Sequence, residues 1–179
     1  MIRSILLLVT LAISGAGIAA DQAINYSDFQ QGFMQAIAEY SGKYKKAENE
    51  LQKSALVTER FQRFTKLKGD PKHIKDWIGV VETMGTNGDG KAYATIRLSP
   101  NLLTVSTWNN AFSDASDHSL IPQSSPVFKK LALMKPGNVV KFSGRLKHAK
   151  NMTEEGKMLT PDFLFIFTDI EKIGERAQP

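Results

Sequence analysis

The spacing of apolar residues changes once along this 179-residue chain, near residue 70, and that change limits the folds open to it. Before this point apolar residues recur at steps of three and four, which places them along one side of a helix. After it they alternate with polar residues, the period of strands that bury one face. Gly69 and Pro71 at the boundary are typical of a helix end. The sequence therefore predicts a helical segment over residues 21–70 and a mainly β domain over residues 71–179.

The helical segment, which we expect to be helix over residues 23–68, has one apolar and one polar face. Ser27 and Gln30 predict a capping box, in which the hydroxyl and the amide satisfy free N–H groups of the first turn. The first part of the apolar stripe comprises Phe29, Phe33, Ile37, Tyr40, Tyr44, Ala47 and Leu51. We interpret it as packing on the chain's own domain, against the outer face of the last strand. A short coiled coil or a partner-binding helix is the alternative. In that case the candidate partner-binding residues are Phe33, Ile37, Tyr40 and Tyr44.

The domain that follows is expected to contain strands at residues 75–84, 91–98, 102–109, 139–147 and 162–171, and a helix at 124–134. Asn87–Gly90 predicts a hairpin turn, because these residues accept positive φ at little cost. Gly79 inside the first strand indicates a bulge or bend that helps a barrel close. The order of elements is that of the five-stranded OB barrel. We therefore predict an α+β, mainly β fold: an OB-fold barrel with a helix between strands 3 and 4, preceded by the helical segment. An SH3-like small barrel and an open α+β sheet are the alternatives.

Several segments of this domain resemble a known group of proteins. They are Trp77–Val81, Val105–Asn110, Leu120–Ser125, Phe128–Leu131 and Gly137–Gly144. Over residues 74–172 they resemble exported proteobacterial proteins that are themselves similar to the tRNA-anticodon-like OB superfamily. The resemblance implies an OB fold and export. It carries no catalytic residue to this chain, and the helical segment lies outside it.

Residues 1–20 have the order of parts of a secretory signal peptide. Arg3 gives a positive start, residues 5–13 are apolar except for one threonine, and Ala19 and Ala20 offer a small-residue cleavage point. The apolar run is shorter than the roughly 20 residues that span a bilayer. We expect cleavage near Ala20 and a periplasmic location. An uncleaved N-terminal anchor is the alternative, and membrane association is expected only in that case.

The charged residues and the residues able to do chemistry point away from several classes of protein. The formal net charge of +5 is mild and spread along the chain, whereas a duplex-DNA binder concentrates a stronger excess on one face. Without cysteine, a zinc site would need several His, Asp or Glu ligands brought together. Asp114, Asp117 and His118 are the best local group, and we interpret them as a polar loop. No nucleophile motif, phosphate-binding loop or dinucleotide fingerprint is present. We expect no catalytic residue, no metal, no cofactor and no enzymatic activity.

The predicted second and fourth strands place cations and hydroxyls on one face and apolar side chains on the other. The exposed OB face around strands 2 and 3 binds single strands or sugars, and aromatic rings beside cations suit stacking. The candidate ligand-binding residues are Tyr93, Arg97, Trp108, Lys141, Arg145 and Lys147. A solvated outer surface, with the tryptophan in the core, is the alternative.

Three functions follow from these patterns. We expect a non-catalytic periplasmic binding module that recognises an envelope protein or peptide. Binding of single-stranded nucleic acid or another polyanion in the cell envelope is the alternative. A hydrolase whose site is assembled across loops is a third hypothesis, which no local motif supports.

Overall fold

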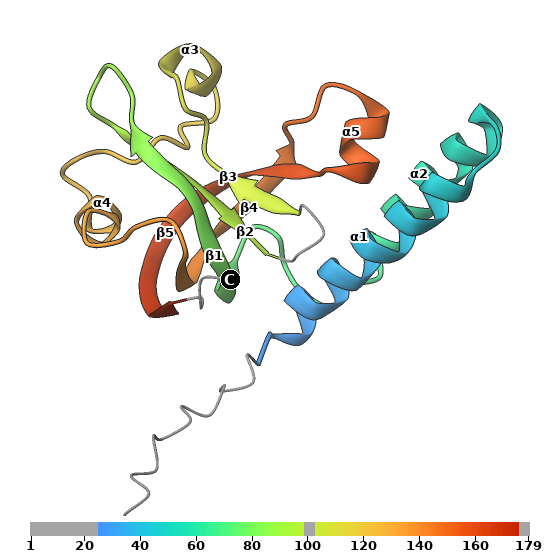
Figure 1. Ribbon diagram of the computed structural model, residues 1–179, viewed down its shortest axis with the longest axis horizontal. Helices are drawn as coiled ribbons and strands as arrows, with labels where there is room; N and C mark the ends of the chain where they lie inside the picture. Colours follow the sequence, from blue (N-terminus) through green and yellow to red (C-terminus); the bar gives the residue numbers. More distant parts are fainter. Residues whose placement is uncertain (1–24, 99–102, 176–179) are drawn as a thin grey trace, which may run out of the picture.

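A computed structural model describes residues 25–98 and 103–175 of the chain (Figure 1). The helices are α1 (Asp28–Lys46), α2 (Glu50–Thr65), α3 (Ala111–Asp114), α4 (Pro126–Leu131) and α5 (Glu154–Leu159). The strands are β1 (Ile74–Thr86), β2 (Ala92–Arg97), β3 (Thr104–Ser106), β4 (Asn138–Ala149) and β5 (Asp162–Glu175). The predicted signal peptide at 1–20 lies outside the described residues. Within the described ranges, no helix combines the length and the apolarity needed to cross a membrane.

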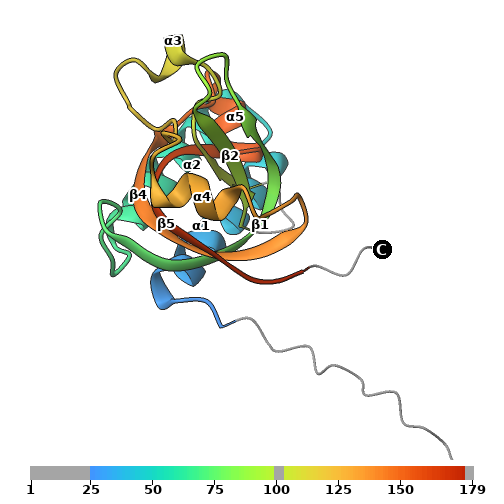
Figure 2. The same cartoon turned by 90° about the vertical axis from the view of Figure 1, so that its left-hand side faces the viewer.

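The five strands form one closed barrel in the order β1-β2-β3-β5-β4. All neighbouring strands are antiparallel except β3 and β5, whose parallel pairing closes the barrel. One short helix, α4, lies between β3 and β4 in the chain as predicted, and α3 precedes it in a stretch expected to be loop. The prediction of an OB-fold-like barrel of the α+β class, preceded by a helical segment, is confirmed. Figures 1 and 2 place α4 and the α1–α2 pair on opposite sides of the barrel.

Glycines allow the strands to approach closely at two points of the barrel. At Gly79 an added Cβ would lie 2.5 Å from the side chain of Ile96 in β2, so the strand needs a residue without a side chain there. The register shifts of β1 fall on either side of this glycine, near Asp76 and near Glu82, instead of at Gly79 itself. At Gly144 an added Cβ would collide with the backbone of β5. Both glycines are therefore explained by close packing between neighbouring strands.

The hairpin turn between β1 and β2 forms as predicted. The Asn87 side-chain oxygen accepts hydrogen bonds from the backbone N–H groups of Asp89 at 3.1 Å and Lys91 at 2.9 Å. Gly90 has φ +74°, a backbone conformation that glycine adopts without strain. The conformation of these four turn residues thus fixes the register of β1 with β2.

The N-terminal segment is two helices instead of the single helical stretch expected over 23–68. Ala47 leaves the helical conformation with ψ 130°, and the Asn49 side chain accepts a hydrogen bond from Gln52 N at 3.0 Å to begin α2. The two helices pack side by side. Leu51, expected on the first apolar stripe, is exposed at the start of α2 because the break rotates it away.

The apolar stripe of α1 is buried inside the chain's own structure. Phe33 lies with its ring centroid 5.5 Å from Trp77 of β1, 5.2 Å from Phe163 of β5 and 5.1 Å from Phe64 of α2. Further along the helix, Tyr40 and Tyr44 pack with a buried methionine of α5. The stripe therefore covers only the beginning of the last strand, and α5, in a segment expected to be loop, covers the rest of the stripe.

This packing bears directly on the candidate partner-binding residues. Phe33, Ile37, Tyr40 and Tyr44 are between 1% and 8% exposed. A partner has no access to such side chains while the fold is intact. The structure agrees with the prediction that the stripe packs on the chain's own domain. These four residues have no exposed surface that a partner could bind.

Gln30 joins α1 to the barrel. Ser27 caps the helix as predicted, with its hydroxyl accepting from Gln30 N at 3.3 Å. The other half of the predicted capping box does not form, because the Gln30 side chain points to β1. Its Nε2 donates to the Ile78 carbonyl at 2.5 Å, and its Oε1 accepts from the Ile78 N–H at 2.9 Å. The amide thereby pairs with one residue of β1 much as a neighbouring strand would, and Gln30 is fully buried.

Candidate functional site

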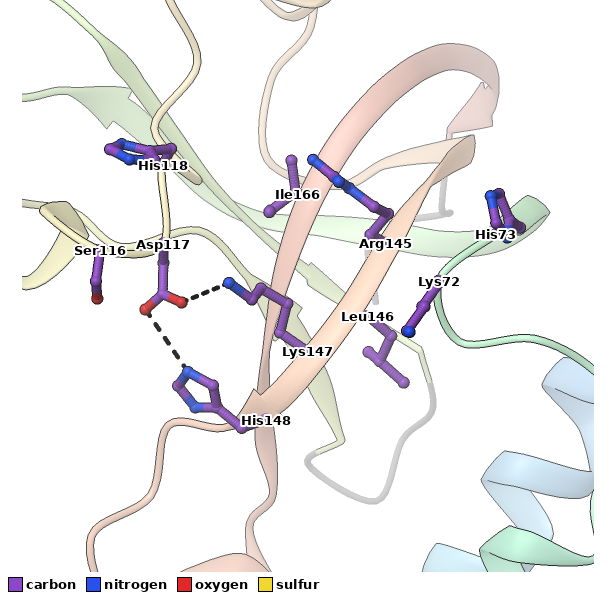
Figure 3. A pocket seen from close by; sticks show the side chains of 10 residues that line it. All are labelled: Lys72, His73, Ser116, Asp117, His118, Arg145, Leu146, Lys147, His148 and Ile166. Atoms are coloured by element: carbon purple, nitrogen blue, oxygen red, sulfur yellow. Dashed lines mark hydrogen bonds and ion pairs between the residues drawn. The ribbon is translucent and has the colours of Figure 1, made fainter.

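A pocket of about 680 Å³ opens on the outside of the barrel over β4 and β5 (Figure 3). Its volume falls in the range of ordinary ligand sites. Four separate segments contribute to its lining: the residues before β1, the loop between α3 and α4, the end of β4, and β5. The lining residues are Lys72, His73, Ser116, Asp117, His118, Arg145, Leu146, Lys147, His148 and Ile166.

Two features of the barrel bring these segments together. Arg145 of β4 is in register with Ile166 of β5, so their side chains share one face of the sheet. The backbone N–H of Leu146 donates to the Pro71 carbonyl at 2.8 Å, which holds the residues before β1 beside the end of β4. Lys72 follows directly and therefore reaches the pocket.

The loop that carries residues 116–118 is held by a buried carboxylate. Asp114 accepts hydrogen bonds from the backbone N–H and hydroxyl of Ser119 and from the N–H of Leu120, at 2.5 to 3.2 Å. These contacts give a buried charge the donors it needs. Asp114 is therefore a structural residue, and it turns the following residues of the loop toward the pocket.

The lining combines cationic side chains with a small apolar surface. Lys72, Arg145 and Lys147 have cationic side chains, and the half-buried Ile166 lies on the same face of the sheet as Arg145, whereas Leu146, beside it in β4, packs toward the core. All three histidines of the chain also line the pocket. Its single lining carboxylate belongs to Asp117. Such a pocket favours a ligand that is anionic at one point and apolar at another.

Asp117 is the most heavily bonded side chain of the pocket. One carboxylate oxygen accepts from Lys147 Nζ at 2.7 Å, and the other accepts from Trp108 Nε1 at 3.0 Å and lies 3.6 Å from His148 Nε2. The hydrogen bond from Lys147, and after it that from Trp108, lowers the pKa of the Asp117 carboxyl below its usual value. Figure 3 shows the lysine and the histidine directed at the carboxylate from β4.

A second contact between a histidine and a carboxylate lies at the edge of the pocket. His73 Nδ1 is 2.6 Å from an oxygen of Asp70, and this contact lowers the pKa of that carboxyl. Both groups are exposed, so the pair is solvated. The pocket therefore keeps an excess of cationic groups after its ion pairs are counted.

The predicted ligand-binding residues divide between this pocket and other surfaces. Arg145 and Lys147 line it, and Trp108 reaches it through Asp117. The others lie elsewhere. Arg97 is 3.5 Å from Glu82, Lys141 is 3.4 Å from Glu171, and Tyr93 lies against Gly85.

These two groups of cations do not form one surface. Arg97 of β2 pairs with Val80 of β1, and Val80 pairs in turn with Val139 of β4. Arg145 lies six positions beyond Val139 on the same strand, about 20 Å at the usual rise per residue. The two outward rows of cations expected on strands 2 and 4 therefore lie in separate regions of the barrel surface.

Sequence reasoning missed Lys72, His73 and His148 as members of one site. Lys72 and His73 are adjacent, but His148 lies 75 positions after His73, and the three have no characteristic spacing. The available signal was the pairing of β1 with β4, because antiparallel pairing places the residues before β1 beside the end of β4.

Two other groups in the described residues could be taken for chemical sites. Within the described ranges no group of three His, Asp or Glu side chains is placed to hold a metal ion, and Asp114 is used by its own loop. Ser106 accepts from Lys150 Nζ at 2.6 Å, a contact that resembles a nucleophile with its base. The serine is buried, and the lysine is paired with Asp162 at 3.1 Å. We interpret this group as a brace between β3 and β5.

No protein-family model, curated protein or solved structure matches the chain. The resemblance to exported OB-fold proteins therefore stays a prediction, and the pocket itself is the basis for an argument about function.

Proposed function

We propose that the chain is a non-catalytic periplasmic binding module that takes a peptide segment of an envelope protein in the pocket over β4 and β5. The observation that carries the proposal is the combination of three cationic side chains with the half-buried, apolar Ile166 in one pocket. An acidic side chain of the peptide meets Arg145 or Lys147, and an apolar side chain lies on Ile166, which shares a face of the sheet with Arg145. The periplasmic location rests on the pattern of residues 1–20 alone.

The proposal moves the interaction surface away from the helices. The stripe of α1 is already covered by β1, β5 and α5, so it has no exposed area to offer. The pocket keeps its cationic groups accessible, since the side chains of Lys147 and His148 are half-exposed to well exposed. An exposed surface on which cations outnumber carboxylates is better suited to a partner than a buried stripe.

The test is fluorescence anisotropy with residues 21–179 and three labelled peptides. The first peptide has glutamates on both sides of a leucine, the second replaces the glutamates with glutamine, and the third replaces the leucine with serine. We expect the first to bind at least tenfold more tightly than either of the others. Failure of the first peptide to bind even at low salt refutes the proposal.

Two matched double variants separate the pocket from general charge. Arg145→Glu with Lys147→Glu changes the pocket, and Lys45→Glu with Lys46→Glu makes the same change of charge on exposed residues of α1. We expect the pocket variant to lose at least tenfold in affinity and the α1 variant to stay within about threefold of wild type. Equal losses in both would show that only overall charge matters.

Single-stranded nucleic acid is the second candidate ligand, favoured by the cationic side chains of the pocket. Binding to phosphates releases counterions, with a slope of log K against log salt of about −0.7 per contacted phosphate for single strands. Contacts from Lys72, Arg145 and Lys147 would give a slope near −2. An oligonucleotide that binds with this slope and loses affinity in the pocket variant, together with peptides that do not bind, would favour this candidate over ours.

A further inference from the structure

The side chain of Asp117 lies at the position where the acidic group of a ligand would bind. It is the single carboxylate of the lining, and its oxygens contact Lys147, His148 and Trp108. A peptide carboxylate entering the pocket would seek the same donors, because charge-assisted hydrogen bonds to ammonium groups are the strongest available there. The pocket thus already holds one anion, supplied by its own loop.

Asp114, the last residue of α3, and Asp117, in the loop that follows, differ in the groups that they contact. The Asp114 carboxylate accepts from backbone N–H groups of its own loop and fixes the loop's shape. Among the described residues, the Asp117 carboxylate accepts two hydrogen bonds, both from side chains outside the loop: Trp108 and Lys147. Rotation of the Asp117 side chain would therefore release the donors of the pocket without breaking a backbone contact of the loop.

We propose that Asp117 is a displaceable internal ligand, and that the partner segment is a peptide with at least two neighbouring acidic residues. One peptide carboxylate replaces Asp117 at Lys147 and His148, and the second binds Arg145. A single carboxylate would only exchange one ion pair for another, whereas a second acidic group adds a contact that Asp117 does not make. This inference rests on the proposed function and specifies the ligand of the same pocket.

The first test compares the affinities of two labelled peptides, with two adjacent glutamates or one, for three forms of residues 21–179. These forms are wild type, Asp117→Asn and Glu48→Gln, which removes one exposed negative charge from the α1–α2 turn far from the pocket. If the internal carboxylate occupies the donors in about nine of ten molecules, removing it raises the affinity of both peptides about tenfold. We expect the Glu48→Gln form to stay within twofold of wild type, and the wild type to prefer the two-glutamate peptide.

The second test follows Trp108 by fluorescence. Displacement of Asp117 removes the acceptor of the indole N–H, so emission of the wild type shifts when the two-glutamate peptide binds. The free Asp117→Asn form already lacks the carboxylate and should show a smaller shift. Trp108→Phe identifies the source of the signal, because the other tryptophan, Trp77, is buried in the core.

The outcomes separate this inference from the proposed function. Peptide binding by the wild type with no shift of Trp108, or with an affinity that Asp117→Asn leaves equal or weaker, overturns the inference and leaves the proposed function standing. Absence of binding in every form overturns both. If Asp117→Asn fails to fold, the presence or absence of the wild-type fluorescence shift alone decides the inference.

Discussion

Replacing Gln30 by leucine should loosen α1 from the barrel while keeping the volume of the core. The substitution removes both hydrogen bonds to the Ile78 backbone, at 2.5 and 2.9 Å, in a position that is fully buried. Each backbone group left without a partner costs about 1–3 kcal/mol, and leucine fills nearly the same space. We expect a loss of about 3 kcal/mol of unfolding free energy. For a domain near 150 residues this lowers Tm by about 10 °C.

The assay is thermal unfolding followed by circular dichroism, with Gln31→Leu as the matched control. Gln31 is the next residue of α1 and is exposed, so the same chemical change there should move Tm by no more than about 2 °C. If Gln30→Leu behaves like the control, water or another group satisfies the Ile78 backbone. The helix would then be held by its aromatic contacts, and our account of Gln30 would be wrong.

Three further predictions concern stability, each checked by Tm. Gly144→Ala should lower Tm by more than about 5 °C, because the added Cβ collides with the Ile166 carbonyl. Gly42→Ala, in open space on α1, should instead raise the free energy of unfolding by about 0.5–1 kcal/mol. The pKa of Asp117 is lowered in the folded state, so its contribution to the free energy of unfolding is present above the ordinary carboxyl pKa of about 4 and is lost as pH falls. The Tm difference between wild type and Asp117→Asn should therefore shrink from pH 6 to pH 3. A constant difference would contradict this. Arg60→Ala should cost about 2 kcal/mol, because this side chain is 7% exposed and donates to a carbonyl oxygen of α5 at 2.8 Å; an unchanged Tm would refute that role.

The barrel could be predicted because the alternation of apolar and polar residues in its strands shows which side chains are buried. In β2, the alternation that begins at Ala92 and Tyr93 appears in the structure as alternating buried and half-buried residues. Local turn chemistry at Asn87 and Gly90 then fixes one hairpin. Strands and turns that depend on residues close together in the sequence could be predicted in this way.

The pocket could not be predicted by the same reasoning, because its members meet only through the register of β4 with β1 and β5. Arg97 on strand 2 and the row with Arg145 and Lys147 on strand 4 were each expected to face outward, but the sequence pattern does not place the two rows relative to each other. The long β4 strand takes Arg145 and Lys147 well past the level of Arg97. The role of Gln30 was predicted wrongly for a similar reason. A capping box is a local pattern, but the Gln30 amide binds the backbone of a residue 48 positions away.

The contact between Phe33 and Phe163 also sets an order of events during synthesis. The two rings lie 5.2 Å apart in the folded chain, yet they are separated by 130 positions in the sequence. At about 5–20 residues per second, a ribosome needs on the order of ten seconds to make the intervening chain. During that interval the apolar stripe of α1 has no β5 to cover it. The nascent helices therefore remain open to chaperones, and to one another, until the last strand is made.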